Sequence, residues 1–294
     1  MLVFDAVHKA YGTKAVLRDF SLTVPEGTCF GFCGANGAGK TTAMRIALGM
    51  LPPDSGSVTF AGRPITADVR ERIGYMPEER GLYGQMRPVD QLVYFAALSG
   101  VGRRTAKRRA VDLMDRMGVK YEPKDKVDEL SLGNQQKVQL IAAVIHEPDI
   151  LVLDEPFSGL DPVATDAMTD VLRRFTASGT PVLFSSHQLE LVERVCDRVG
   201  IVSEGRMVAA GTVDELGGHG SAITVRVAGG RTSWAATLPT VAVTVDPVTD
   251  AVEVDLTAGV TVDEVLRAAS SSGPVEHVSM SHRSLTEIFR EAVS

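Results

Sequence analysis

The sequence is poor in cysteine and has no long hydrophobic run. Its 294 residues include 3 cysteines, which are too few and too far apart for a disulfide framework. Cys29 and Cys33 do not have the spacing of a CxxC redox pair, so we expect both to be buried thiols in a reducing cytosol. The longest apolar run, residues 140–145, is far shorter than the roughly 20 residues that a membrane-spanning helix needs. We therefore expect that any work at a membrane requires another chain to span it.

An excess of positive charge is also missing. The 30 Lys and Arg are outnumbered by 37 Asp and Glu, which gives a net charge of −7. Domains that bind a nucleic acid duplex are usually basic, so we expect no nucleic acid partner. Asp5 and His8 interrupt the first apolar stretch, so no signal peptide is expected. Residues 103–109 are locally basic. We interpret them as a solvated helix face, and contact with anionic lipid or an acidic partner is the alternative.

Strand-like and helix-like segments alternate through most of the chain, which predicts an α/β fold. Strands are expected at residues 2–4, 22–24, 28–33 and 58–60. The short apolar runs at 150–153 and 182–185 are typical of buried parallel strands. Helices are expected at residues 42–51, before two prolines, and twice between about residues 88 and 120.

The chain changes character after residues 217–221, which read Gly-Gly-His-Gly-Ser. Residues 223–227 and 252–256 alternate with period two, whereas residues 262–269 and 285–292 have helical periodicity. We expect a large domain over residues 1–216, with a helical subdomain at about 85–146, and a small α+β domain over residues 217–294. The small domain has no cluster of ligand-type residues. We interpret it as a dimerisation or stabilising module, and a regulatory or substrate-sensing role is the alternative.

A glycine-rich segment connects the strand at 28–33 to the helix at 42–51. Residues 34–41 read Gly-Ala-Asn-Gly-Ala-Gly-Lys-Thr and fit the P-loop pattern. Its glycines let backbone N–H groups converge on phosphate oxygens, and the helix presents its positive N-terminal end to them. Lys40 would add a charge at the β- and γ-phosphates, and the Thr41 hydroxyl could bind Mg²⁺. The segment therefore predicts a nucleoside triphosphate site.

Two carboxylates follow the apolar segment at residues 150–153. Asp154 lies at the strand end, where it can hold the coordination shell of Mg²⁺. Glu155 points elsewhere because it is the next residue, and it can polarise a water at the γ-phosphate. Beside a P-loop, this pair predicts hydrolysis of the nucleotide.

A second anion site is predicted upstream, at residues 130–136, which read Leu-Ser-Leu-Gly-Asn-Gln-Gln. Ser131, the Gly133 N–H and the dipole of the helix that starts here form a helix N-terminus of the kind that binds phosphate. Taken alone, this segment is an ordinary helix cap. Its place shortly before Asp154 and Glu155 is what makes it informative.

Together these motifs resemble the ATP-binding subunit of ATP-binding-cassette (ABC) transporters, over about residues 2–216. Residues 130–135 resemble the family signature LSGGQ, with Leu132 and Asn134 replacing two inner positions. Residues 158–161, Ser-Gly-Leu-Asp, match the D-loop. His187 matches the switch histidine, and Tyr11 matches the aromatic residue that stacks on adenine.

The resemblance implies a P-loop NTPase fold of ABC type, with an antiparallel β subdomain and a helical subdomain. Two such domains would pair head to tail, as a homodimer or with a paralogue, and ATP would lie between the P-loop of one and residues 131–135 of the other. Glu155 would be the general base, His187 would hold the γ-phosphate, and Asp161 would communicate across the interface.

The implied cofactors are ATP and Mg²⁺, and the implied partner is a transmembrane permease on a separate chain, at the cytoplasmic face of the membrane. Residues 78–98 would pass motion to that permease. The implied site comprises the catalytic residues Glu155 and His187, the metal ligands Thr41, Glu78 and Asp154, and the nucleotide-binding residues Tyr11, Gly34, Ala35, Asn36, Gly37, Ala38, Gly39, Lys40, Thr41, Thr42, Ser131, Gly133, Asn134, Gln135 and Asp161.

One position departs from the family pattern. Family members usually carry glutamine where this chain has Glu78, after the strand at 73–76. Glutamate still offers an oxygen but adds a full negative charge, so altered metal dependence is expected. The sequence of residues 75–83 is similar to that of a subgroup that energises sodium, antibiotic or peptide exporters. The tail, which ends in Ser-Leu-Thr-Glu-Ile-Phe at 284–289, also resembles the C-terminal domain of that subgroup.

The alternative function is a soluble ABC-type ATPase without a permease, such as a ribosome-acting factor or a repair factor. Ribosome-acting relatives carry two cassettes, whereas this chain has a single P-loop. Repair relatives insert a long coiled coil between the P-loop and the signature, and no heptad run appears there. A non-enzymatic module that has kept ATP binding is disfavoured by the presence of Lys40, Asp154, Glu155 and His187.

Overall fold

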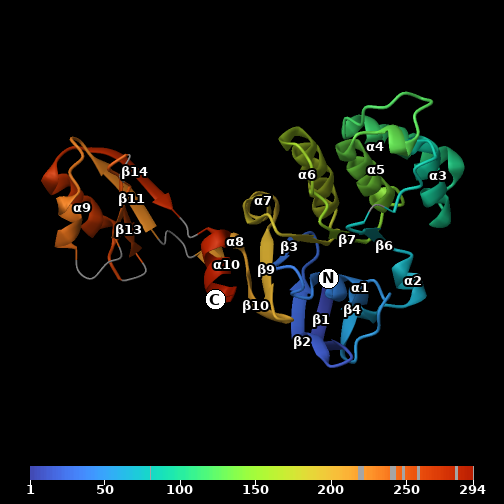
Figure 1. Cartoon of the computed structure of the whole chain (residues 1–294), viewed down its shortest axis with the longest axis horizontal. Helices are drawn as coiled ribbons and strands as arrows, with labels where there is room; N and C mark the ends of the chain where they lie inside the picture. The colour runs from blue at the N-terminus through green and yellow to red at the C-terminus, as the bar shows by residue number, and fades with distance from the viewer. Residues whose placement is uncertain are drawn as a thin grey trace. The chain divides into compact units, whose positions relative to one another are not determined.

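The computed structural model divides the chain into two compact units, Met1–Ala210 and Gly211–Ala292 (Figure 1). It describes residues 1–79, 81–217, 222–238, 243–246, 249–256, 259–281 and 284–293. Arg80, within the exporter-type segment, and residues 218–221, at the expected domain boundary, lie outside the described residues. The boundary near Gly217 stays a prediction.

A six-stranded sheet forms the centre of the first unit. Its strand order is β10 (Arg206–Gly211), β9 (Arg198–Ser203), β3 (Cys29–Gly34), β8 (Val182–Ser186), β7 (Ile150–Asp154) and β6 (Ile73–Met76). The pairs from β9 through β3, β8 and β7 to β6 are parallel. Every residue of β3, β7 and β8 is buried, because helices cover parallel sheets on both faces. The carboxyl ends of these strands therefore meet at one edge, where ligands bind in open α/β sheets.

An antiparallel sheet packs beside the central one. Its strand order is β2 (Lys14–Val24), β1 (Leu2–Tyr11), β4 (Ser55–Phe60) and β5 (Arg63–Pro64). Phe20 connects the two sheets, with its ring centroid 5.4 Å from Phe4 of β1 and 5.7 Å from Phe32 of β3. Strands β1 and β2 are much longer than the expected 2–4 and 22–24. Their other halves carry exposed polar residues and register shifts, which hide the period of two.

Helix α1 runs over Lys40–Ala47, so the expectation of residues 42–51 was wrong at both ends. It starts earlier because Gly39, with φ of 110°, turns the chain directly into the helix. It ends before the prolines because Gly49 takes a left-handed conformation, with φ of 63°, which is the usual glycine stop of a helix. The Met50 N–H then donates to Arg45 O and caps the last turn.

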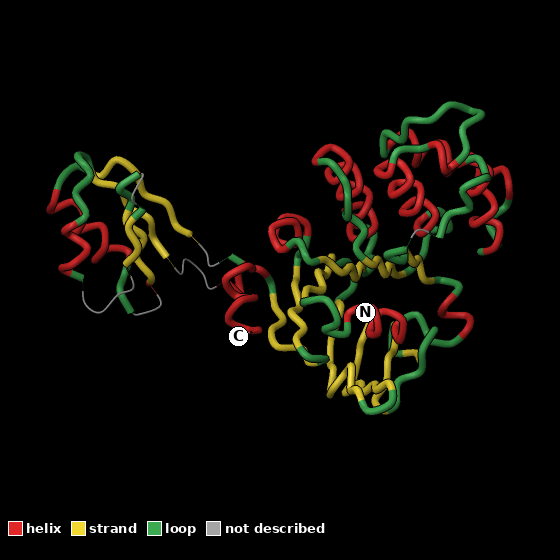
Figure 2. Tube along the Cα trace, in the orientation of Figure 1, coloured by secondary structure: helices red, strands yellow, loops and turns green. Residues whose placement is uncertain are grey.

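Three helices that pack against one another form a separate layer: α3 (Pro88–Leu98), α4 (Arg103–Arg116) and α5 (Leu132–Val144) (Figure 2). The remaining helical elements of this unit are α2 (Ala67–Arg70), η1 (Val127–Glu129), α6 (Pro162–Ala177) and α7 (Leu189–Val195). The basic run lies on α4, where Arg109 pairs with Glu147 and the other four cations are at the surface. None of the helices in the described residues is long and apolar enough to cross a bilayer.

The second unit is a small α+β domain. Its antiparallel sheet has the order β12 (Val243–Val245), β13 (Val252–Asp255), β11 (Ala222–Val227) and β14 (Val275–Ser281). Its helical elements are α8 (Val213–Gly217), η2 (Ser233–Thr237), α9 (Val262–Ser272) and α10 (Leu285–Val293). Trp234, Val225, Val254 and Val265 are buried together in a core that belongs to this unit alone.

Candidate functional site

The segment from Gly34 to Gly39 joins β3 to α1 at the carboxyl edge of the central sheet. Gly37 and Gly39 have φ of 81° and 110°, a region that residues with a Cβ rarely adopt. A Cβ at Gly39 would also lie 2.9 Å from Val16 O. The loop therefore needs glycine at both places, and it ends on a helix N-terminus that favours an anion.

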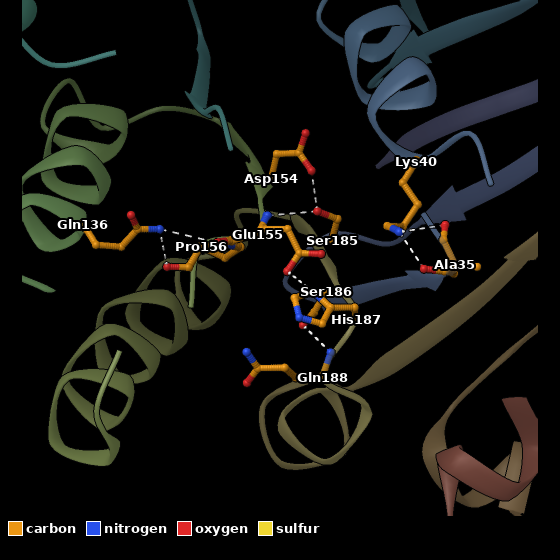
Figure 3. A network of polar contacts seen from close by, with 11 residues as sticks. Ala35, Lys40, Gln136, Asp154, Glu155, Pro156, Ser185, Ser186, His187 and Gln188 are labelled. Atoms are coloured by element: carbon orange, nitrogen blue, oxygen red, sulfur yellow. Dashed lines mark hydrogen bonds and ion pairs between the residues drawn. The ribbon is translucent and has the colours of Figure 1, made fainter. Parts of the chain in front are cut away.

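Lys40 is the first residue of α1 and is only 8% exposed. Its Nζ donates to Gly34 O at 2.6 Å and to Ala35 O at 3.3 Å, so the ammonium lies across the loop (Figure 3). Buried charges in proteins need hydrogen-bonding partners, and two carbonyls meet that need here. The position places a positive charge where the phosphates of a nucleotide would enter.

A cavity of about 370 Å³ opens at this loop. Its lining comes from β2, the phosphate loop, the start of α1, the segment after β6 and the end of β7: Lys14, Val16, Asn36, Gly37, Gly39, Lys40, Thr41, Thr42, Glu78, Asp154 and Glu155. The structure thus brings the P-loop, both carboxylates and Glu78, all of them predicted site residues, to one cavity.

Asp154 and Glu155 are connected through Ser185 of the neighbouring strand. Ser185 Oγ donates to Asp154 Oδ1 at 2.5 Å and accepts the Glu155 N–H at 2.9 Å (Figure 3). Asp154 is 2% exposed and Ser185 is fully buried, so this contact holds a carboxylate that has little access to water. The serine therefore fixes both acidic residues at the end of β7.

His187 lies within hydrogen-bonding distance of Glu155, with Nδ1 3.0 Å from Glu155 Oε2. The imidazole is 59% exposed, whereas the Glu155 side chain is 12% exposed. Burial raises the pKa of Glu155 above its usual value of 4.5, and the hydrogen bond and charge of His187 oppose that shift. A carboxylate with a raised pKa beside a histidine is a typical arrangement for proton transfer.

The raised pKa of Glu155 predicts how stability depends on pH. The folded chain keeps this proton to a higher pH than the unfolded chain does, so the free energy of unfolding falls as the pH rises above about 4.5. We expect Glu155→Gln to lose this pH dependence and to be at least as stable as the parent protein near neutral pH. Thermal unfolding over a pH series measures it, with Glu190→Gln in α7 as the matched exposed control. Lower stability of Glu155→Gln at neutral pH would contradict the prediction.

The predicted second anion segment does not line this cavity. Ser131 is the N-cap of α5, and its Oγ accepts the Asn134 N–H at 3.4 Å. Asn134 Nδ2 donates to Lys120 O, and Gln135 Nε2 donates to Leu130 O at 3.1 Å. A Cβ at Gly133 would have only one neighbour in van der Waals contact. The segment therefore forms an open helix N-terminus away from the phosphate loop.

Three further predicted residues, Asp161, Tyr11 and His187, also lie outside the cavity lining. Asp161 caps α6, where its Oδ1 accepts the Ala164 N–H at 2.7 Å. Tyr11 is 50% exposed at the end of β1, and its strand partner is Lys14, which does line the cavity. Gly34, Ala35 and Ala38 belong to the loop itself without facing the cavity.

Sequence reasoning missed Ser185, Lys14 and Val16. Ser185 carries a weak signal, since it is a hydroxyl residue at the end of an apolar strand that leads to His187. The role of Lys14 and Val16 follows from the hairpin of β1 and β2, which places the start of β2 beside the phosphate loop.

The oxygens of Thr41, Glu78 and Asp154 line one cavity and suit a hard cation such as Mg²⁺. In the part of the chain that the structure describes, no group of three His, Cys, Asp or Glu residues could hold a metal by itself. In nucleotide sites Mg²⁺ usually takes one or two protein carboxylates, together with waters and substrate phosphates. The residues present therefore fit the ion.

Comparison with known families gives two matches. Residues 17–158 match the ABC transporter family, and residues 211–293 match the C-terminal domain of DrrA1-3-like ATP-binding proteins. The ABC transporter ATP-binding protein YhaQ of Bacillus subtilis is 44% identical over 74% of this chain and 72% of its own length. The daunorubicin resistance ATP-binding protein DrrA3 of Streptomyces coeruleorubidus is 34% identical over 98% of this chain and 94% of its own length.

Solved structures give the same result. The ATP-binding subunit of an ABC transporter superposes with a TM-score of 0.68 at 30% identity, covering 74% of this chain and 91% of that subunit.

Proposed function

The chain belongs to the family of ABC transporter ATP-binding proteins and is an ATPase, and we propose that its ATP hydrolysis drives export through a separate permease. Membership confirms the family that the motifs predicted and the P-loop NTPase fold of ABC type. Export is supported by the relative named for daunorubicin resistance, which aligns with nearly the whole chain, tail included. We place the protein at the cytoplasmic face of the membrane.

One observation supports the proposal: the phosphate loop, Asp154 and Glu155 line a single cavity, and His187 is hydrogen-bonded to Glu155. In this arrangement Lys40 and the loop N–H groups bind the phosphates. Glu155 accepts a proton from the attacking water, and His187 orients that carboxylate and contacts the γ-phosphate. Hydrolysis then depends mainly on positioning and electrostatics.

A second copy of the chain, or a paralogue, completes the site. Ser131, Gly133, Asn134 and Gln135 form a helix N-terminus suited to phosphate but lie outside the cavity. A head-to-tail pair would bring this segment onto ATP bound by the partner's phosphate loop, with Asp161 at the interface and Tyr11 against the adenine. ATP would therefore hold the two copies together.

Thr41, Asp154 and Glu78 would hold Mg²⁺ beside the bound nucleotide. The ion supplies a positive charge that neutralises charge on the β- and γ-phosphates. Thr42 and Asn36 line the same cavity and would bind phosphate oxygens.

Replacing Glu78 by glutamine is expected to change the metal dependence of hydrolysis rather than abolish it. Glu78 is exposed and lines the cavity, so its charge adds to the attraction for a divalent ion. Removing this charge should raise the Mg²⁺ concentration needed for half-maximal rate by about 2–10-fold. Titration of the rate with Mg²⁺ and Mn²⁺ measures this, with Glu79→Gln as the neighbouring control. Unchanged titrations would refute the assignment of Glu78.

Co-purification from detergent-solubilised membranes tests the proposed function as a whole. We expect a tagged chain to recover a protein with about six spanning helices, the number typical of the permeases that the resemblance implies. Recovery with ribosomes instead would refute export and support an ATPase without a permease.

A further inference from the structure

Gln136, a buried residue in the first turns of α5, contacts the backbone of the catalytic loop. Its side chain is enclosed, since the residue is 5% exposed. Its Nε2 donates to Pro156 O at 3.0 Å and to Glu155 O at 3.4 Å (Figure 3). We propose that Gln136 is a positioning residue that holds Glu155 in its active geometry and couples it to the signature segment of the same chain. This proposal rests on the proposed function.

Glu155 needs such support because its backbone is strained. Its φ is 50°, in the left-handed region that residues other than glycine rarely occupy. Strained conformations of this kind persist only where the surroundings hold them. Here Ser185 Oγ accepts the N–H of Glu155, and the amide of Gln136 donates to the carbonyls of Glu155 and Pro156. The two contacts fix the peptide units on both sides of the residue and so aim its carboxylate.

The position of Gln136 in α5 gives this contact a second consequence. Gln136 directly follows Gln135, whose Nε2 donates to Leu130 O and Val127 O, so the segment from 130 to 136 is a stiff unit. In the proposed dimer that unit touches ATP bound by the partner copy, whereas Glu155 acts on ATP bound by its own chain. Gln136 therefore connects the two nucleotide sites of the dimer through a single buried side chain.

Two variants test this. Gln136→Leu removes the donor at similar volume, and Gln136→Glu keeps the shape but places carboxylate oxygens against two carbonyl oxygens. We expect both to lower kcat by roughly 10–100-fold, because small misplacement of a reacting group costs about that much. We also expect the Hill coefficient for ATP to fall from above 1 to about 1, while the Kd of a fluorescent ATP analogue changes less than about threefold.

Gln91→Leu is the matched control. Gln91 is also a fully buried glutamine whose Nε2 donates to a backbone carbonyl, Tyr83 O at 2.8 Å, but it does not reach Glu155. We expect its melting temperature to fall about as much as that of Gln136→Leu, with kcat and Hill coefficient near the parent values. A purely structural role for Gln136 would make the two glutamine variants behave alike, and that result would overturn the proposal.

The outcomes separate the proposal from the function on which it rests. If the parent protein hydrolyses ATP cooperatively and a folded Gln136→Glu or Gln136→Leu keeps both kcat and Hill coefficient, the assignment of Gln136 is wrong. If the parent protein itself hydrolyses no ATP, the proposed function fails first, whatever the variants do.

Discussion

Glu155→Gln is expected to lower kcat for ATP hydrolysis by roughly 10²–10⁴-fold, which is the usual contribution of a general base. The amide has the same shape and can still meet His187, but it cannot accept a proton from water. Lys40 and the phosphate loop are untouched, so the Kd for ATP should stay within a few-fold of the parent value. Steady-state phosphate release and equilibrium nucleotide binding give the two quantities separately.

The control for this substitution is Glu190→Gln. Glu190 is an exposed glutamate on α7, shortly after His187 in the chain, and it has no place in the cavity lining. Its variant should keep the parent rate. A Glu155→Gln protein that retained more than about a tenth of the parent rate would show that another group takes the proton. His187 would then be the first residue to substitute, since its side chain is hydrogen-bonded to that of Glu155.

The site could be predicted from sequence wherever its residues are close together in the chain. The phosphate loop lies within residues 34–41, and Asp154 and Glu155 follow one apolar strand directly. Ser185 could not be found in this way, because it is 31 residues from Asp154 and becomes its partner through the parallel register of β7 and β8. Pairing between parallel strands depends on the whole sheet, and no local pattern encodes it.

The strands and helices were likewise predicted where the pattern is local in the chain and missed where it depends on distant residues. Strands β7 and β8 were predicted nearly to the residue, because a strand buried on both faces is an uninterrupted apolar run. Strand β10 was missed, since exposed and half-buried residues alternate along this edge strand of the sheet. Strand β9 was missed although its four middle residues are buried. Gln136 lies in a helix that was predicted, but its contact with the carbonyl of Pro156 depends on how α5 packs, which periodicity does not determine.

The proposed nucleotide site is shared between two copies of the chain, so retention of ATP should depend on which variants are mixed. In a Glu155→Gln background, where bound ATP should persist, a Lys40→Ala chain lacks the phosphate contact and a Ser131→Arg chain has a bulky side chain at the second segment. Neither chain alone can form a complete site with its own copies, so neither should retain ATP through gel filtration. A mixture should form dimers in which one of the two sites pairs an intact phosphate loop with an intact Ser131 segment.

We therefore expect the mixture to retain ATP, at about half the amount per mixed dimer that the unmodified Glu155→Gln protein holds. Ser131 is exposed and caps α5, so arginine there costs about 1 kcal/mol of local stability without unfolding the chain. Ser178→Arg, at the exposed C-cap of α6, is the matched control and should retain ATP without any mixing. If mixed dimers form but hold no ATP, the two segments do not share a nucleotide across the interface. The open helix N-terminus at Ser131 would then need another ligand, because Ser131 does not line the cavity of its own chain.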